Sequence, residues 1–131
     1  MRNSDQTLIE AARQARERAQ AIYSKFKVGT ALLGGEGKIF TSCNIESSSY
    51  GLTLCAERVA LFKALSEGER QFVRMVVVAD TEALTPPCGA CRQVLWDFCG
   101  DLDVMMANLK GNSKRTRLSS LFPDPFGRCF L

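Results

Sequence analysis

Three cysteines and one glutamate have the residue types and the spacing with the clearest chemical use. Cys55 and Glu57 begin the run CAERVALFKA, and Cys88 and Cys91 form the C-x-x-C pair of PCGACRQVL. Thiolates bind zinc, attack electrophiles or pair as a redox couple, and the chain has no histidine that could replace one of them. Taken by itself, the C-x-x-C pair leaves three alternatives open: a zinc site, a thioredoxin-like redox pair and simple burial in a helix.

Both cysteine runs begin helical sequence that follows a loop. Cys55 opens a run that ends at Gly68, a typical C-cap residue, and Cys88 opens a second run after a proline-containing loop. Unpaired N–H groups at a helix N-terminus lower the pKa of a thiol, and Cys91 lies one turn after Cys88 on the same face. If both helices flank one sheet, three thiolates point at one place. Three ligands leave the fourth position of tetrahedral zinc for water, as in catalytic sites.

The remaining cysteines offer no convincing fourth ligand. Cys43 lies in a predicted strand, Cys99 ends a predicted helix and Cys129 is near the C-terminus, and each is expected to be a small buried apolar side chain. The first residues are polar, with an acidic residue within five positions, which does not match a signal peptide. A cytoplasmic location is therefore expected, where six cysteines do not form a disulfide framework.

Glu57 and Arg58 lie beside Cys55 in the first turn of its helix. A carboxylate near a metal-bound water can take a proton and give it back, although a first-turn glutamate is also common simply because the helix dipole favours it. Three thiolates and Zn²⁺ make a centre of net negative charge, which weakens the acidification of bound water. We expect Arg58 and the two helix dipoles to offset part of this charge.

Strands and helices alternate along the chain. Four runs are typical of β-strands: 26–33, 38–45, 72–80 and 102–109. Four runs are typical of helices: 4–22 with a cap at Asn3 or Ser4, 55–68, 88–98 and 119–122. This order predicts one α/β domain over residues 1–131, with three layers (α/β/α) and a mixed sheet of about five strands whose later members are parallel. Ligands bind at the carboxyl ends of such strands, where Cys55 and Cys88 are expected to lie.

Charge and hydropathy exclude two classes of partner. The net charge of +3 is too small to indicate a nucleic-acid groove, and the nearest basic cluster, Lys114, Arg115 and Arg117, is typical of a solvated face. No apolar run approaches the roughly 20 residues of a membrane span. We therefore expect neither nucleic acid nor membrane as a partner.

The two cysteine runs together resemble the paired zinc signatures of the cytidine deaminases, specifically the small free-nucleoside type with three cysteine ligands. The resemblance extends through YSKFKVGTALL (23–33), CNIESSSYG (43–51) and PDPFG (123–127), so it covers most of the chain. Two such signatures at this separation are far more specific than a lone C-x-x-C pair.

The resemblance implies a zinc-dependent hydrolase of pyrimidine salvage. It would convert free cytidine and deoxycytidine to uridine and deoxyuridine plus ammonia, with one Zn²⁺ per subunit held by Cys55, Cys88 and Cys91. In zinc deaminases as a class, zinc-bound hydroxide attacks C4 of the base while a glutamate moves the protons. That role falls here to Glu57, which would deprotonate the water, protonate ring N3 and protonate the leaving amine.

The resemblance also implies a substrate pocket and an assembly. Phe26 would pack on the pyrimidine, Asn44 and Glu46 would hold the ribose 3′-hydroxyl, and the backbone of Ala56 would contact the pyrimidine carbonyl. Members of this length form homotetramers in which a C-terminal phenylalanine, here Phe126, reaches the active site of a neighbour.

Several positions depart from the family pattern. Ser47 and Ser48 replace the usual Asn-Ala, Thr30 replaces an alanine, and Pro86 replaces a serine. None is a predicted zinc ligand or the predicted acid–base residue. Two alternative functions are a deaminase of a nucleoside antibiotic such as blasticidin S and a non-catalytic structural zinc module. Retention of Asn44 and Glu46 favours an ordinary nucleoside over the antibiotic, and a structural zinc site has no use for Glu57.

Overall fold

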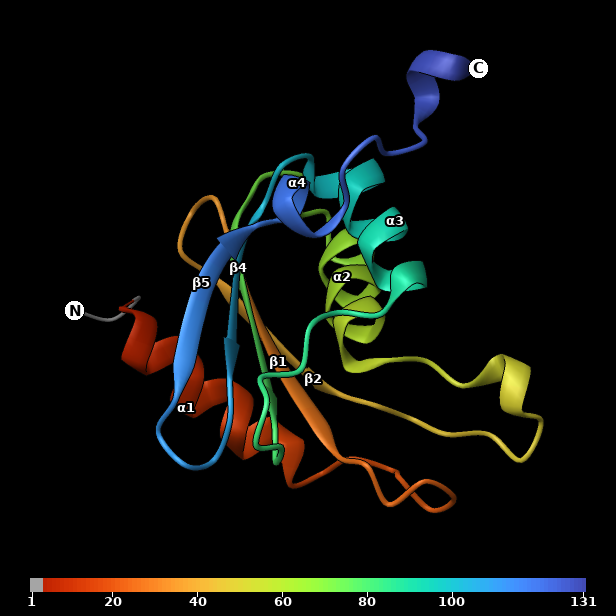
Figure 1. The fold of residues 1–131 in the computed structure, drawn as a ribbon. Helices are drawn as coiled ribbons and strands as arrows, with labels where there is room; N and C mark the ends of the chain where they lie inside the picture. The colour runs from red at the N-terminus through yellow and green to blue at the C-terminus, as the bar shows by residue number, and fades with distance from the viewer. Residues whose placement is uncertain (1–3) are drawn as a thin grey trace.

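A five-stranded mixed sheet forms the middle layer of the computed structural model, which describes residues 4–131 (Figure 1). The strands are β1 (Val28–Gly34), β2 (Ile39–Cys43), β3 (Phe72–Ala79), β4 (Asp103–Ala107) and β5 (Ser113–Arg117), in the order β2-β1-β3-β4-β5. β3 and β4 are parallel, and the other neighbouring pairs are antiparallel. The predicted mixed sheet is confirmed. Its fifth strand is β5, which the sequence pattern did not identify because its alternating charged residues resemble a loop.

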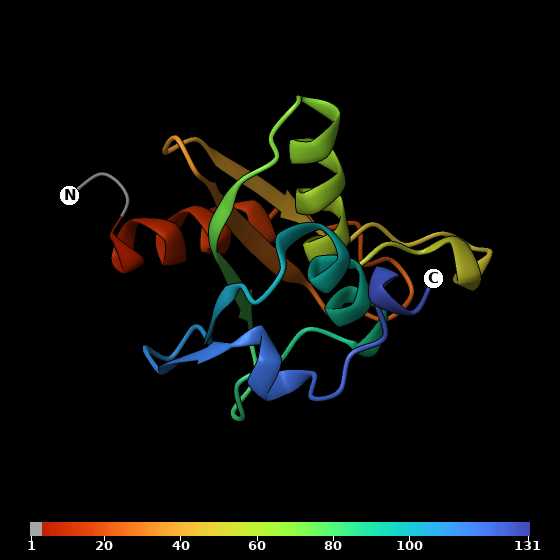
Figure 2. The ribbon, with the colours of Figure 1, turned by 90° about the horizontal axis from the view of Figure 1, so that it is seen from above.

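Helices cover both faces of the sheet (Figure 2). α1 (Asp5–Arg16) packs on one face, while α2 (Ala56–Ser66), α3 (Gly89–Cys99) and the short α4 (Leu118–Leu121) pack on the other. Two 3₁₀ turns, Tyr50–Leu52 and Arg128–Phe130, lie outside these layers. Alternate residues of β3 point to opposite sides, so that Met75 joins the core under α2 and Val76 joins the core under α1. The three-layer α/β/α prediction is confirmed.

α1 ends earlier than its apolar periodicity predicts. Ser4 caps it by accepting the N–H of Thr7 at 3.2 Å, as expected, and the alternative cap Asn3 lies outside the described residues. The predicted continuation to residue 22 is wrong, because Ile22 is 58% exposed and the chain beyond Arg16 turns away from the helix. Gln20 instead donates its main-chain N–H to Asn44 at 2.9 Å. Pairing with a distant segment therefore overrides the local helical pattern.

Gly29 allows α1 to lie directly on β1. A Cβ atom at this position would be 2.0 Å from the carbonyl oxygen of Ala12, a distance at which the main chains would have to separate. The close contact anchors the end of α1 beside β1, and it therefore fixes where the following residues 17–27 leave the helix layer.

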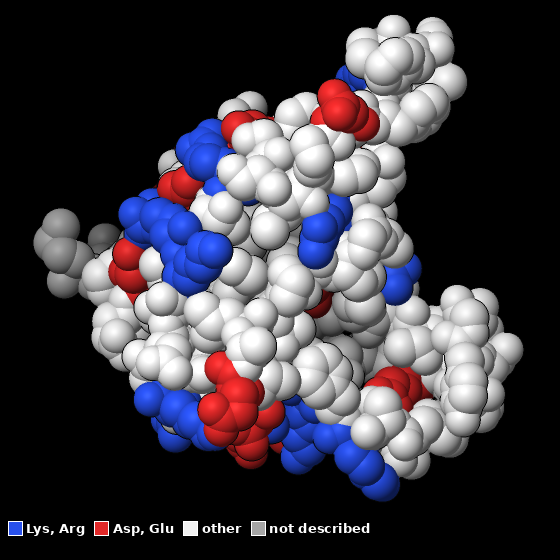
Figure 3. All heavy atoms as spheres, in the orientation of Figure 1, with Lys and Arg blue, Asp and Glu red and all other residues white. Residues whose placement is uncertain are grey.

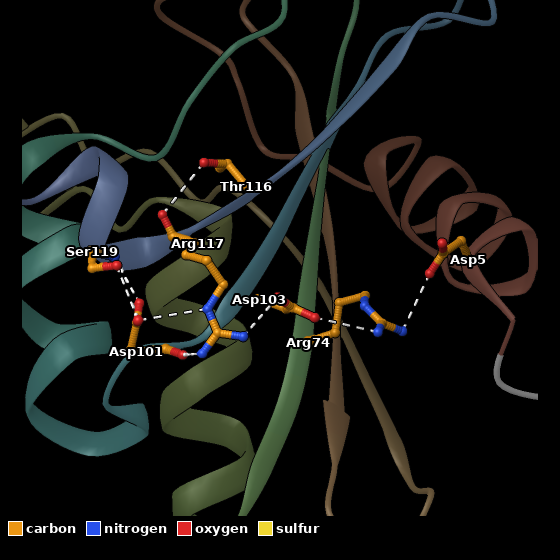
Figure 4. Close-up of polar contacts among 7 residues, drawn as sticks. All are labelled: Asp5, Arg74, Asp101, Asp103, Thr116, Arg117 and Ser119. Atoms are coloured by element: carbon orange, nitrogen blue, oxygen red, sulfur yellow. Dashed lines mark hydrogen bonds and ion pairs between the residues drawn. The ribbon is translucent and has the colours of Figure 1, made fainter.

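An ion-pair network joins four elements along the β5 side of the sheet (Figure 4). Arg74 of β3 contacts Asp5 at 3.2 Å and Asp103 at 3.4 Å, and Arg117 of β5 contacts Asp103 at 3.1 Å and Asp101 at 3.5 Å. The network ties the edge strand β5 to β3, β4 and the start of α1. It also neutralises part of the basic cluster that the sequence shows in β5.

The face of the molecule drawn in Figure 3 shows no basic groove. On the face drawn in Figure 3, Lys and Arg side chains alternate with Asp and Glu and do not form a continuous track. Within residues 4–131, no helix combines the length and the apolar character that crossing a membrane requires.

Candidate active site

Three thiols meet where two helices begin on the same face of the sheet. Cys55 is the N-cap residue of α2 and Cys88 is the N-cap residue of α3, and both have extended backbone angles. Their sulfur atoms are 3.6 Å apart, and Cys91, one turn into α3, places its sulfur 3.5 Å from that of Cys88. The convergence of two helix N-termini predicted from the sequence is therefore present.

The three sulfur atoms fit the ligand set of a zinc ion. All three lie within 4.8 Å of one another, and none of these cysteines forms a disulfide. Zinc–sulfur bonds of about 2.3 Å at tetrahedral angles place ligand sulfurs about 3.8 Å apart, close to the two contacts above. Among the described residues, no other His, Cys, Asp or Glu joins this group. The donor set leaves one tetrahedral position for a non-protein ligand.

Arg58 brings a positive charge to this thiol cluster. Its Nη2 atom lies 3.8 Å from the sulfur of Cys55 and donates to the carbonyl oxygen of Thr53 at 3.3 Å. In the metal-free chain, a hydrogen bond from the Cys91 thiol and the contact with Arg58 lower the pKa of Cys55 to about 5. The pKa of Cys91 is raised, because its thiol donates this hydrogen bond to Cys55 and would lose it on ionising. The surroundings of Cys55 therefore favour its thiolate form.

Among residues 4–131, Glu57 is the one charged side chain that is buried beside the thiols. Only 4% of the residue is exposed, and burial raises the pKa of its carboxyl to about 7, with a smaller contribution from the negative charge of Cys55. A carboxyl with a pKa near 7 can both accept and donate a proton at physiological pH. The arrangement therefore supplies an acid–base group next to a candidate metal.

A cavity of about 240 Å³ opens directly onto these groups. Thirteen residues line it: Ser24, Phe26, Val28, Asn44, Glu46, Thr53, Leu54, Cys55, Ala56, Glu57, Thr85, Pro86 and Cys88. Every residue that the sequence assigns to the pocket of its own chain is present, namely Phe26, Asn44, Glu46 and Ala56. This volume is just below the roughly 300 Å³ at which pockets for drug-sized ligands begin, so the cavity suits a small ligand.

Asn44 and Ala56 each keep a polar group for a ligand. The Asn44 amide donates to the carbonyl of Phe26 at 2.8 Å and accepts the N–H of Val28 at 2.9 Å, which uses one of its two N–H groups and one of its two lone pairs. The carbonyl of Ala56 accepts the hydroxyl of Ser42 at 2.5 Å, while its N–H belongs to the first turn of α2, where helix donors have no intrahelical partner.

The sequence pattern missed Ser24, which lines the cavity next to Glu46. One oxygen of Glu46 accepts the main-chain N–H groups of Tyr23 and Ser24 at 2.9 and 3.0 Å, and the other accepts the Ser24 hydroxyl. The Ser24 hydroxyl bond is the largest of the effects that lower the pKa of Glu46. The position of Ser24, two residues before Phe26 in YSKF, could have indicated a role near Phe26. Its contact with Glu46 could not be read from the sequence, because Glu46 is 22 residues away in the chain.

Phe126 does not reach the cavity of its own chain. It lies in the C-terminal tail that leaves the body of the molecule (Figure 1), where it is 55% exposed and stacks on Phe130 with ring centroids 5.7 Å apart. Its carbonyl accepts the side-chain amide of Gln93 at 2.9 Å, which ties the tail to α3. The role of Phe126 in a neighbouring active site stays a prediction.

The other cysteines lie outside the cluster. Cys43 and Cys99 are half-buried, and burial raises the pKa of Cys99 to about 12. The prediction that Cys129 is buried is wrong, because it belongs to the projecting C-terminal tail and is exposed.

Three of the residues that depart from the family pattern, Thr30, Ser47 and Pro86, lie in different surroundings. Pro86 lines the cavity, so its ring shapes the pocket wall. Ser47 donates its main-chain N–H to the hydroxyl of Thr53 at 3.0 Å, which closes the loop 47–53 that follows Glu46. The hydroxyl of Thr30 is fully buried and finds no hydrogen-bond partner among the described residues.

Comparison with known proteins agrees with this geometry. Residues 2–107 match the family model described as "Cytidine and deoxycytidylate deaminase zinc-binding region". The chain is 51% identical over 122 residues to a cytidine deaminase of Sporosarcina psychrophila, covering 92% of this chain and 90% of the relative. A cytidine deaminase of Halalkalibacterium halodurans is 52% identical over 122 residues, or 92% of each chain. A blasticidin-S deaminase of Bacillus cereus is 28% identical over 136 residues, or 96% of each chain.

A solved structure shows the same fold. The crystal structure of a cytidine deaminase from Burkholderia pseudomallei superposes with a TM-score of 0.91 at 48% identity, covering 94% of this chain and 99% of that one.

Proposed function

The chain belongs to the cytidine and deoxycytidylate deaminase family, and from this membership we propose that it is a zinc-dependent cytidine deaminase. It hydrolyses cytidine and deoxycytidine to uridine and deoxyuridine and releases ammonia. The observation that carries the proposal is the position of Glu57, buried beside three convergent thiols at the wall of a cavity of about 240 Å³.

Glu57 is the proposed proton shuttle. Because the pKa of its carboxyl is raised to about 7, both of its protonation states are accessible near neutral pH. Glu57 takes a proton from the attacking water and delivers it to ring N3, which makes C4 more electrophilic. After the water oxygen bonds to C4, Glu57 passes the second proton to the amine, which leaves as ammonia. One water is consumed for each nucleoside converted.

Cys55, Cys88 and Cys91 would hold one zinc ion per chain. Zinc, when bound, supplies a Lewis acid that makes a water nucleophilic near neutral pH. Three thiolates give this centre an excess of negative charge, which the guanidinium of Arg58 and the N-termini of α2 and α3 partly offset. The charge balance is therefore distributed over two helices and one side chain.

Phe26, Asn44, Glu46 and Ala56 are the proposed substrate contacts. Phe26 is 41% exposed and lines the cavity, so its ring can pack on a pyrimidine. The remaining N–H of the Asn44 amide can donate to a ribose 3′-hydroxyl, and the carboxylate of Glu46 can accept from it. The N–H of Ala56 suits the pyrimidine carbonyl.

The charge of the cavity favours a nucleoside over a nucleotide. Its lining includes two carboxylates, Glu46 and Glu57, and no Lys or Arg. A 5′-phosphate carries negative charge and is commonly met by Arg or Lys side chains that donate to its oxygens. The family model includes both nucleoside and deoxycytidylate deaminases, and the acidic lining supports the nucleoside assignment for this chain.

The assembly and the cellular role are further parts of the proposal. We propose one catalytic domain per chain, assembled as a homotetramer in the cytoplasm and acting in pyrimidine salvage. Support for assembly comes from large apolar side chains exposed on two projecting segments: Tyr50 and Leu52 on one, and Phe126, Phe130 and Leu131 on the other. Light scattering after size-exclusion chromatography measures the mass directly, and a monomer would contradict this part alone.

The central test is the conversion of cytidine by purified, zinc-loaded protein, followed by ultraviolet absorbance with ammonia release as a cross-check. We expect uridine and ammonia in equal amounts. Deoxycytidylate and blasticidin S serve as comparison substrates in the same assay. Absence of uridine would refute the proposed function, and a higher kcat/KM for either comparison substrate would reassign the substrate class.

A further inference from the structure

We propose that Ser24 is a positioning residue for substrate recognition, because its hydroxyl holds both the Glu46 carboxylate and the main chain of Phe26 beside the cavity. The inference rests on the proposed function, in which Glu46 contacts a ribose hydroxyl and Phe26 packs on the pyrimidine. Ser24 lines the same cavity as both residues. It thereby connects the part of the site that would bind the sugar to the part that would bind the base.

The Glu46 carboxylate has three protein donors that fix its plane. Oε1 accepts the N–H groups of Tyr23 and Ser24, and Oε2 accepts the hydroxyl of Ser24. A carboxylate has about four acceptor positions, so the fourth remains on Oε2. That oxygen is oriented by the Ser24 hydroxyl. The acceptor position left for a sugar hydroxyl therefore depends on Ser24.

The same hydroxyl also closes the turn that carries Phe26. It accepts the N–H of Phe26 at 3.0 Å, while it donates to Glu46. Lys25 lies between Ser24 and Phe26, and its φ is 62°. This is the left-handed region, which residues other than glycine and asparagine rarely adopt. A serine hydroxyl that accepts a main-chain N–H two residues later is a known way to stabilise such a turn. One side chain thus sets the positions of two proposed substrate contacts.

Ser24 has little part in the hydrophobic core. Residues 22–26 are exposed, and no residue of this segment belongs to either core cluster. Removing the hydroxyl should therefore leave folding intact and show its effect in substrate recognition.

The experiment compares cytidine with 3′-deoxycytidine as substrates of the zinc-loaded full chain. The variants are Ser24→Ala, Ser24→Thr, Glu46→Ala and the double variant Ser24→Ala/Glu46→Ala. Ser66→Ala is the matched control, because its hydroxyl donates to the carbonyl of Lys63 at the end of α2, away from the cavity. Thermal unfolding of each variant checks that the fold is retained.

We expect Ser24→Ala to raise KM for cytidine about tenfold, as for the loss of a hydrogen bond to a charged group, with kcat changed less than about threefold. The preference for cytidine over 3′-deoxycytidine should fall to the level of Glu46→Ala. The double variant should be worse than Glu46→Ala only by the part that acts through Phe26, and therefore by less than the full Ser24→Ala loss. Ser24→Thr should keep the preference because it keeps a hydroxyl, and Ser66→Ala should match the wild type.

Two results with the Ser24 variants would overturn the inference: a preference in Ser24→Ala that is unchanged because both substrates lose equally, or a double variant whose loss is the product of the single losses. An unchanged preference in Glu46→Ala would also overturn it, since Ser24 is proposed to act through that carboxylate. The proposed function fails separately, and only if wild-type protein makes no uridine.

Discussion

The guanidinium of Arg58 lies against the sulfur of Cys55, with Nη2 3.8 Å from Sγ. Both residues belong to the start of α2, so one turn of helix supplies a zinc ligand of the proposed site, a countercharge and, in Glu57 between them, the buried carboxyl. Three thiolates leave the proposed zinc centre one negative charge in excess. A cation held 3.8 Å from a ligand sulfur reduces that excess.

Removing the charge of Arg58 should weaken zinc binding. We expect Arg58→Gln to raise the zinc dissociation constant about tenfold, as for other residues that contact metal ligands, and Arg58→Lys to retain most of the affinity. Competition with a chromophoric chelator measures both constants. Equal affinities for wild type and Arg58→Gln would remove Arg58 from the account of charge balance.

The zinc stoichiometry should depend on three of the six cysteines. Replacing Cys55, Cys88 or Cys91 singly by serine should lower the bound zinc from about one ion per chain to a small fraction, because two thiolates bind zinc far more weakly than three. Elemental analysis after desalting gives the stoichiometry. Cys99→Ser is the matched control and should retain full zinc; a loss of zinc in the control would mean that a fourth thiol contributes.

Glu57→Gln should separate catalysis from metal binding. We expect turnover of cytidine to fall about 10³-fold, because an amide cannot transfer protons, while zinc content remains at one ion per chain. The two outcomes are read from the absorbance assay and from elemental analysis of the same preparation. Full activity in this variant would support a different proton shuttle, and an inactive wild type with full zinc content would support the structural zinc module.

Removing the metal should change which thiols react with an alkylating reagent. In zinc-loaded protein at pH 8 we expect the exposed Cys129 to react first and Cys99 to react slowly, because a pKa of about 12 leaves little thiolate. Chelation should add rapid labelling at Cys55 and Cys88. Mass spectrometry of peptides identifies the modified sites, and labelling of Cys88 that is unaffected by chelation would argue against its role as a ligand.

The buried hydroxyl of Thr30 is expected to lower the free energy of unfolding, because it has no hydrogen-bond partner among the described residues. Thr30 lies opposite Ser42 in the β1–β2 register, but the Ser42 hydroxyl donates to Ala56 whereas the Thr30 hydroxyl has no partner among the described residues. Thr30→Val keeps the shape and should raise the free energy of unfolding by about 1 kcal/mol, and Tm by about 4 °C. Ser42→Ala is the control and should lower Tm. A lower Tm in Thr30→Val would show that the hydroxyl is bonded.

Much of the fold was predictable because its signals are local. The C-x-x-C spacing of Cys88 and Cys91 is one helical turn, so it predicts that both sulfurs face the same way wherever the helix lies. Ser4 is a recognisable helix cap, and the β-branched run of β3 is typical of a buried central strand. These features depend on neighbours within a few positions, and the sequence records them directly. Strand β5 was missed because an edge strand needs no apolar alternation.

Other features depend on which distant segments pack together. Cys55 and Cys88 are 33 residues apart and meet only because α2 and α3 begin at the same edge of one face of the sheet. The pKa of Glu57 is raised mainly because packing removes its carboxyl from water, and α1 stops at Arg16 because the following chain pairs with the segment around Asn44.

The amino-acid sequence by itself therefore determined the chemical inventory of this protein: three thiols, a carboxyl, and the helices and strands that carry them. Tertiary structure decided the distances between the three sulfur atoms and the burial of Glu57. It also decided the contacts of the Ser24 hydroxyl, which donates to Glu46 and accepts the N–H of Phe26. The physical reason is that hydrogen bonding and desolvation act between atoms that are close in space, and closeness between distant segments exists only once the sheet and helices have packed.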